Sequence, residues 1–139
     1  MNIGVLGAGT MGHGIAQVNA SAGHSVTLRD VDPDIVEQGI RTVEENLQGA
    51  VERNKATEEE AEAALARIEG TTDLDTAVSD ADLVIEAVPE DMDLKKSIFT
   101  DIEAAAPADT VIGTNTSSLS VTELAGTLDH PERAVGLHF

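Results

Sequence analysis

The sequence predicts an α/β domain in which a parallel sheet has helices on both faces. Short runs of Val, Ile and Leu, with the length of buried strands, alternate with longer segments whose apolar residues recur at helical spacing. A glycine-rich turn, Gly7-x-Gly9-x-x-Gly12, follows the first apolar run. Regular alternation of strands and helices is typical of a doubly wound sheet.

The first predicted unit consists of a strand, a helix and a second strand. Residues 2–6 have the apolar pattern of a buried strand, and residues 10–22 present apolar residues on one helical face. Residues 25–30 form the next predicted strand, which ends in an acidic residue, Asp30. The glycine-rich turn thus joins a strand to a helix, as in dinucleotide-binding domains of the Rossmann type.

Each glycine of the turn has a physical role in such a domain. Gly7 allows the tight turn, Gly9 lets the backbone approach the phosphates, and Gly12 lets the helix pack closely on its strand. The unpaired amides of the first helical turn, which includes Thr10 and Met11, then face the pyrophosphate. Glycine-rich turns also occur without a ligand, but the complete surrounding unit favours a dinucleotide.

Asp30 indicates which dinucleotide is bound. A carboxylate at the end of the second strand accepts hydrogen bonds from the adenosine ribose and repels a 2′-phosphate, so NAD is expected rather than NADP. Arg29 is a residue type that holds such a phosphate, but strand alternation directs Arg29 to the face opposite Asp30.

A helical hairpin is predicted between the second and third strands. Asp32 is a suitable N-cap and Pro33 a suitable first residue for a long helix whose apolar face continues to Val51. Thr57-x-x-Glu60 is a capping-box pattern that opens a second helix. A doubly wound sheet needs only one helix in this connection, so the hairpin is an insertion.

The rest of the chain continues the alternation. Pro89 ends one of the strands, because proline cannot donate to a sheet ladder. Strands are predicted at residues 70–73, 82–88, 110–114 and 134–138, and helices at residues 91–105 and 120–126. No repeat or interdomain linker is present, so residues 1–139 are expected to form one domain.

Three groups of candidate residues follow predicted strands and would meet at one edge of the sheet. They are Ala87 to Glu90 with Lys95, Asn115 to Ser118, and His138. Taken singly, each has a structural explanation, such as a solvated helix face for Lys95 or loop capping for the hydroxyls. Together they favour oxidation of an alcohol by NAD, with imidazole as base, a serine hydroxyl as donor, and Asn115 fixing the loop or the nicotinamide. No role is expected for His13, at the surface, or for His24 and His130, in turns.

Composition excludes several classes of function. The chain carries 26 Asp and Glu against 8 Lys and Arg, a net charge of −18, which argues against nucleic-acid or anionic-membrane partners. The absence of cysteine excludes disulfides and thiolate metal sites, and no metal is expected. With no leader and no apolar run near ~20 residues, a cytoplasmic location is expected. The dispersed acids also suggest a salt-rich cytoplasm, although an ordinary acidic protein remains the alternative.

Four segments appear in a particular order: Gly7 to Ala16, Glu86 to Glu90, Asn115 to Leu119, and Gly136 to Phe139. Together with the inserted hairpin they strongly resemble the NAD-binding domain of the 3-hydroxyacyl-CoA dehydrogenase family of fatty-acid β-oxidation. The resemblance covers essentially the whole chain, and the combination is far more specific than any single motif.

The resemblance implies a reaction, namely hydride transfer between the 3-hydroxy group of an acyl-CoA and NAD. Ser117 would hydrogen-bond the substrate's 3-oxygen, and His138 would be the general base. The cofactor site would be lined by Ala87, Glu90 and Lys95, with Asp30 on the adenosine ribose.

Two features of the family are expected to lie outside residues 1–139. Family members continue with a glutamate that orients the histidine, and then with a helical domain that contacts substrate and forms the dimer. This chain is therefore expected to be the NAD-binding domain alone, with little turnover, and the full-length protein to be a homodimer. The alternatives are a β-hydroxyacid dehydrogenase of the 3-hydroxyisobutyrate or 6-phosphogluconate type, and a non-catalytic NAD-sensing module.

Overall fold

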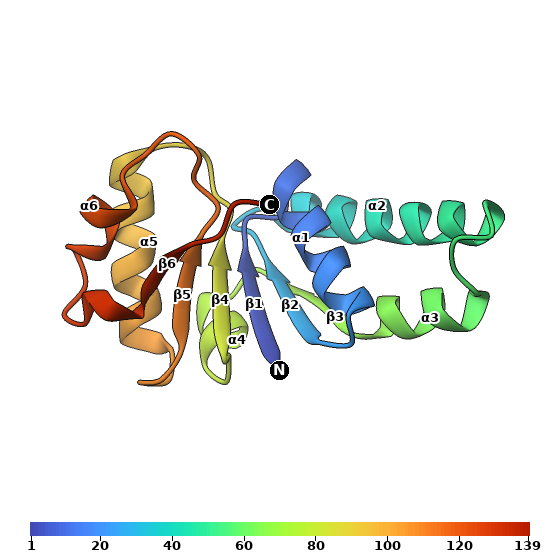
Figure 1. The fold of residues 1–139 in the computed structure, drawn as a ribbon, viewed down its shortest axis with the longest axis horizontal. Coiled ribbons are helices and arrows are strands. Elements are labelled where there is room, and N and C mark those ends of the chain that lie inside the picture. Colours follow the sequence, from blue (N-terminus) through green and yellow to red (C-terminus); the bar gives the residue numbers. More distant parts are fainter.

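Six strands form one sheet in the computed structural model, which describes residues 1–139 (Figure 1). They are β1 (Asn2–Leu6), β2 (Ser25–Arg29), β3 (Ile68–Thr71), β4 (Leu83–Glu86), β5 (Val111–Thr114) and β6 (Ala134–Gly136). The spatial order is β3-β2-β1-β4-β5-β6, and every neighbouring pair is parallel. The predicted doubly wound fold is confirmed. The connections change direction between β1 and β4, where such sheets bind ligands.

Helices cover both faces of the sheet. One face carries α1 (Thr10–Ser21), α2 (Pro33–Glu52) and α3 (Glu58–Ala66), and the other carries α4 (Leu74–Val78), α5 (Met92–Ala105) and α6 (Val121–Ala125), followed by the 3₁₀ helix η1 (Pro131–Arg133). Figure 1 shows α2 and α3 projecting past β3 as the predicted hairpin. No helix combines the length and the apolar character needed to cross a membrane.

Two apolar cores lie on the two sides of the sheet. Consecutive residues of β4 divide between them, since Ile85 packs with the α1 side and Val84 with the α5 side. The largest buried side chain of the second core is Phe99 of α5, which is 0% exposed. Because β1 and β4 are buried on both faces, their carboxyl ends are held rigidly where the candidate residues follow them.

Side-chain caps fix where most helices begin. In each of the helices α2 to α6, a side chain accepts a hydrogen bond from an N-terminal amide, and an acidic residue lies in the first turn. The predicted caps at Asp32, Thr57 and Ser120 are confirmed. By contrast, α1 begins at Gly9 with no side-chain cap and no acidic residue in its first turn.

Several boundaries differ from the sequence prediction. β3 begins at Ile68 rather than at residue 70, because Ile68 is buried and pairs with Val26 instead of facing inward from α3. The short helix α4, capped by Asp73, and the 3₁₀ helix η1 were not predicted. β4 ends at Glu86 and β6 at Gly136, two residues earlier than expected in each case.

Candidate functional site

The three glycines of the turn meet different surroundings. Gly7 has φ +100°, and a Cβ atom there would lie 2.6 Å from the carbonyl oxygen of Ala87. A Cβ atom at Gly12 would overlap the carbonyl oxygen of Gly7. At Gly9, nothing lies within 4 Å of the Cβ position. The fold therefore requires Gly7 and Gly12, whereas open space lies beside Gly9, as expected if a ligand approaches the backbone there.

The start of α1 is suited to an anion. Its first-turn amides have no capping side chain, and no carboxylate lies in that turn, although the chain carries a net charge of −18. Unpaired amides and the helix dipole make such a terminus attractive to a phosphate group. The residues present thus fit the pyrophosphate of a dinucleotide.

A cavity of about 550 Å³ lies at the carboxyl ends of the strands, beside this helix terminus. It brings together every site residue that the sequence predicts except Gly12, which is buried beneath the turn. Of the four other lining residues, Val88 and Pro89 belong to the predicted group Ala87 to Glu90, whereas Ile35 and Phe139 were given no role by the sequence. Ile35 is 41% exposed and Phe139 is 47% exposed, and apolar side chains exposed at a cavity are candidates for contact with a flat ring.

The carboxylate of Asp30 is hydrogen-bonded to the glycine-rich turn. Its Oδ2 accepts a hydrogen bond from the N–H of Ala8 at 3.0 Å, and its Oδ1 accepts one from the N–H of Asp32 at 3.2 Å. The carboxylate therefore holds the glycine-rich turn while still facing the cavity. Arg29 does not line the cavity, and its Nε donates to the carbonyl of Thr72 at 3.1 Å.

A buried ion pair, Lys95 and Glu86, lies between β4 and α5 at the wall of the cavity. Lys95 is 1% exposed and donates to Glu86 and, at 3.0 Å, to the carbonyl of Val88. Its Nζ also lies 3.1 Å from Oε1 of Glu90, so its three protons are matched by three acceptors. The alternative of Lys95 on a solvated helix face is wrong, because the helix turns this position into the core.

Sequence reasoning assigned no role to Glu86, which is 0% exposed. It accepts hydrogen bonds from Lys95, from the Val88 N–H at 2.8 Å and from the Thr114 hydroxyl at 2.7 Å. The signal available in the sequence is a single carboxylate inside the apolar run of β4, which needs a partner if it is buried.

Glu90 links the loops that follow β4 and β5. Its Oε2 accepts from the hydroxyls of Thr116 at 2.6 Å and Ser118 at 2.7 Å. The hydrogen bond from Thr116, followed by those from Ser118 and Lys95, lowers the pKa of Glu90 from its ordinary value of 4.5 to about 2, against the opposing effect of burial.

The two proposed reacting side chains share the cavity. Ser117 and His138 are both exposed there, one from the loop after β5 and the other after β6. The Oδ1 of Asn115 accepts from the N–H of Phe139 at 3.0 Å and so joins these two segments. No other histidine lines this cavity, and His13, expected at the surface, is partly exposed.

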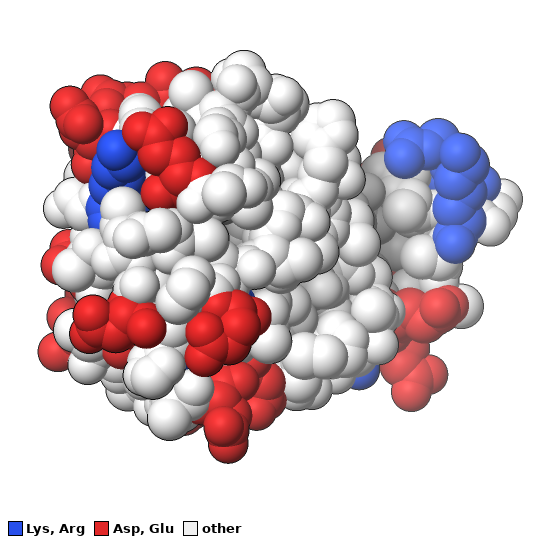
Figure 2. Space-filling view, turned by 60° about the vertical axis from the view of Figure 1, so that its left-hand side comes forward, with Lys and Arg blue, Asp and Glu red and all other residues white.

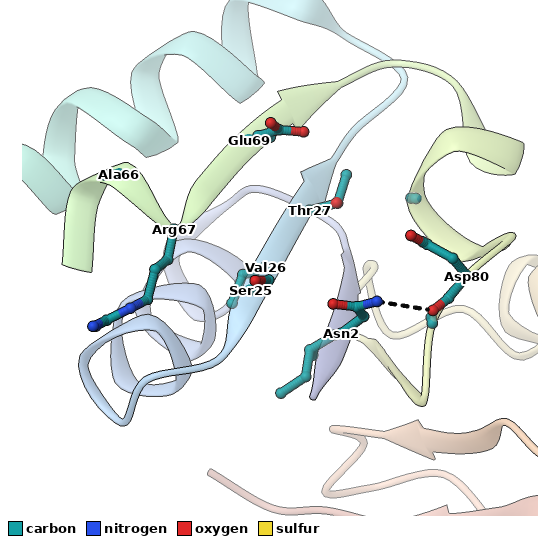
Figure 3. Close-up of a pocket in the computed structure, with 11 residues that line it drawn as sticks. Asn2, Ser25, Val26, Thr27, Ala66, Arg67, Glu69 and Asp80 are labelled. Carbon is teal, nitrogen blue, oxygen red and sulfur yellow. Dashed lines mark hydrogen bonds between the residues drawn. The ribbon is translucent and has the colours of Figure 1, made fainter. Parts of the chain in front are cut away.

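A smaller cavity, of about 270 Å³, lies at the amino ends of β1 and β2 (Figure 3). Its polar side chains bind to the protein's own backbone. The side-chain amide of Asn2 donates to the carbonyl of Asp80 at 3.3 Å, and Arg67 donates to the carbonyl of Ala20 at 2.8 Å. Ligands of doubly wound sheets bind at the opposite edge, so the larger cavity is the candidate site.

The doubly wound sheet, the glycine-rich turn and the uncapped helix define a dinucleotide-binding domain of the Rossmann class. Residues 2–139 match the family model described as 3-hydroxyacyl-CoA dehydrogenase, NAD binding domain. The chain belongs to this family, and its cofactor is NAD.

Characterised relatives share this similarity over the whole chain. The 3-hydroxyadipyl-CoA dehydrogenase of Escherichia coli K12 is 42% identical over 99% of this chain and 29% of its own length. The 3-hydroxybutyryl-CoA dehydrogenase of Bradyrhizobium diazoefficiens is 42% identical over 99% of this chain and 46% of its own length.

The chain is also similar in structure to a solved member of this family. The (S)-3-hydroxybutyryl-CoA dehydrogenase of Ralstonia eutropha superposes with a TM-score of 0.95 and 40% identity, over 99% of this chain and 48% of that one. The chain spans about half or less of the length of these relatives.

Proposed function

We propose that this chain is the NAD-binding domain of an enzyme that transfers hydride between the 3-hydroxy group of an acyl-CoA and NAD. The observation that carries the proposal is that one cavity gathers the glycine-rich turn, Asp30, Ser117 and His138. The names of the relatives, which specify 3-hydroxybutyryl-CoA and 3-hydroxyadipyl-CoA, support the substrate class.

The cofactor is held by groups that the fold leaves available. The first-turn amides of α1, at Thr10 and Met11, bind the pyrophosphate, and Gly9 offers no side chain that would obstruct it. Asp30 accepts hydrogen bonds from the adenosine ribose. Ala87, Glu90 and Lys95 form the opposite wall of the cavity. When bound, NAD supplies the nicotinamide ring that accepts the hydride.

Two residues act on the substrate, and a third positions one of them. His138 takes the proton of the 3-hydroxyl as general base, because imidazole is the side chain most often used for that step. Ser117 donates a hydrogen bond to the same oxygen and so stabilises the carbonyl that forms. Asn115 acts through its hydrogen bond to the N–H of Phe139, which fixes the segment that carries His138.

The remainder of the full-length protein completes the site. We infer that it provides a carboxylate that orients His138, a helical domain that contacts the acyl-CoA, and the interface of a homodimer. Since loss of an orienting carboxylate can cost factors of ~10⁴, residues 1–139 alone should bind NAD with little turnover.

The test compares residues 1–139 with the full-length protein. NADH binding is measured by fluorescence titration, and reduction of acetoacetyl-CoA by loss of NADH absorbance. We expect both proteins to bind NADH more tightly than NADPH, and only the full-length protein to turn over at high rate. Activity with free 3-hydroxy acids but not with acyl-CoA esters would point to another β-hydroxyacid dehydrogenase. Full function after Ser117→Ala and His138→Ala would favour an NAD-sensing module.

The charge balance supports a proposal about where the protein works. Figure 2 shows several groups of Asp and Glu and few Lys or Arg on the face in view, in keeping with the net charge of −18. We infer that the protein works in a salt-rich cytoplasm, where screening relieves the repulsion among these groups.

A further inference from the structure

Glu90 holds the chain on both sides of Ser117. Its single oxygen Oε2 accepts from the Thr116 hydroxyl at 2.6 Å and from the Ser118 hydroxyl at 2.7 Å. Thr116 and Ser118 are the two neighbours of Ser117 in the sequence. The side chain of Ser117 is left exposed in the cavity between two fixed points.

The other oxygen of Glu90 is tied to the core. Its Oε1 lies 3.1 Å from Nζ of Lys95, and Lys95 is held in turn by the fully buried Glu86. Glu86 also accepts from Thr114, the last residue of β5. The carboxylate of Glu90 therefore connects a buried ion pair, which cannot shift without breaking its hydrogen bonds, to an exposed loop.

Thr116 joins the carboxylate of Glu90 to the backbone of the loop that carries Ser117. Thr116 is 8% exposed, and its Oγ1 donates to Glu90 while accepting from the N–H of Leu119 at 3.1 Å. One hydroxyl thus closes the turn after Ser117 and joins that turn to Glu90. Hydrogen bonds to a carboxylate are shorter and stronger than those between neutral groups, so the loop is held firmly.

We propose that Glu90 is a positioning residue that orients the Ser117 hydroxyl toward the substrate oxygen, acting through Thr116 and Ser118. The inference rests on the proposed function, in which Ser117 donates to that oxygen. Without Glu90 the loop of residues 115–119 gains freedom, and the hydroxyl is correctly placed in a smaller fraction of molecules. Misplacement of a reacting group by about 1 Å can lower the rate by ~10²-fold.

The hydrogen bonds from Thr116 and Ser118 to Glu90 are called the clamp below. The experiment uses the full-length enzyme and removes either the acceptor of the clamp or one of its donors. Glu90→Gln removes the charge, Thr116→Val removes one donor while keeping its shape, and Ser118→Ala removes the exposed donor. Thr116→Ser is the matched variant that restores the hydroxyl. Asp93→Asn, which removes an exposed carboxylate from the first turn of the helix that follows Glu90, α5, is the control for loss of charge.

We expect kcat to fall about ten- to a hundredfold in Glu90→Gln and Thr116→Val, and by less in Ser118→Ala. Thr116→Ser and Asp93→Asn should keep kcat near that of the parent enzyme. In Thr116→Val and Ser118→Ala the dissociation constant for NADH should change less than about twofold, because these two residues act on Ser117 and do not line the cofactor cavity. Hydrogen exchange of amides 115–119 should quicken in Glu90→Gln, and the loss from combining it with Thr116→Val should be less than additive.

Two results would overturn the inference and leave the proposed function standing. Normal kcat in Thr116→Val and Ser118→Ala would show that the clamp does not position Ser117. Weaker NADH binding in Glu90→Gln with kcat unchanged would limit Glu90 to its place in the cofactor wall, with no effect on Ser117. A parent enzyme that binds NADH but reduces no 3-ketoacyl-CoA would refute the proposed function itself, and the inference with it.

Discussion

The amide oxygen of Asn115 accepts a hydrogen bond from the backbone N–H of Phe139 at 3.0 Å. Asn115 follows β5 and Phe139 lies beyond β6, so this bond fixes the segment after β6 at the point where it passes the cavity. His138 precedes the donor by one residue. The position of the proposed base is therefore tied to a side chain from the loop that follows the neighbouring strand, β5.

Removing that acceptor should impair the base. Asn115→Ala should lower kcat about tenfold or more, whereas Asn115→Asp, which keeps an oxygen at the same position, should retain more activity. Steady-state kinetics and NADH titration of the full-length protein separate a loss of kcat from a loss of cofactor binding. Equal loss in both variants would argue that the amide nitrogen, and not this hydrogen bond, is the important group.

Gly9 and Gly12 should respond differently to the same substitution. Gly9→Ala places a methyl group in open space, so the melting temperature should hardly change, while NADH binding weakens by at least about tenfold. Gly12→Ala forces a methyl group against the backbone of Gly7 and should destabilise the fold by more than about 3 kcal/mol. Thermal unfolding and NADH titration of both variants provide the comparison. Tight NADH binding by Gly9→Ala would contradict the assignment of the phosphate site.

Breaking the buried pair of Glu86 and Lys95 should destabilise the domain strongly. Lys95→Met leaves two carboxylates without their cation, and a loss of about 3–5 kcal/mol in the free energy of unfolding is expected. Replacing both partners, with Glu86→Leu added to Lys95→Met, should recover part of that loss. Glu37→Gln, in the exposed pair with Arg41, is the matched control and should have no measurable effect. Denaturant unfolding measures all four proteins.

The lowered pKa of Glu90 predicts a pH dependence of stability. Because the pKa is about 2 in the folded protein and near 4.5 ordinarily, the contribution of Glu90 is present above pH 4.5 and is lost as the pH falls toward about 2. Over that range the free energy of unfolding should fall more steeply in the parent protein than in Glu90→Gln. Denaturant titrations at several pH values measure the difference, which isolates Glu90 from the other carboxylates. Parallel curves would show that the hydrogen bonds from Thr116 and Ser118 do not stabilise the charged form.

Salt should stabilise the chain as a whole. With a net charge of −18, repulsion is long-ranged in dilute buffer, and raising the salt from ~0.1 M to ~1 M shortens the screening length from ~10 Å to ~3 Å. The melting temperature should therefore rise with KCl. A melting temperature that stays constant up to molar KCl would contradict the proposed salt-rich environment.

The sequence alone predicted most of the framework because its signals are local. The caps at Asp32, Thr57 and Ser120 each depend on residues within three positions, and the glycine-rich turn depends on one strand and one helix. The short helix α4 escaped prediction because five residues are too few to show a helical period.

The buried pair of Lys95 and Glu86 could not be predicted from neighbouring residues in the sequence. Lys95 and Lys96 are adjacent, yet Lys95 is 1% exposed and pairs with Glu86, nine positions away on another element, while Lys96 pairs with the exposed Glu123. Only the packing of α5 on β4 decides which lysine enters the core. The same limit applies to Glu90, whose partners Thr116 and Ser118 lie on a different loop.

The missing cap of α1 has a consequence for the empty protein. Every other α-helix of the domain carries its own N-terminal acceptor, so α1 is the one whose first turn would fray in the absence of nucleotide. A bound pyrophosphate would act as the sixth cap, and nucleotide would then serve as a folding partner that raises thermal stability with its concentration.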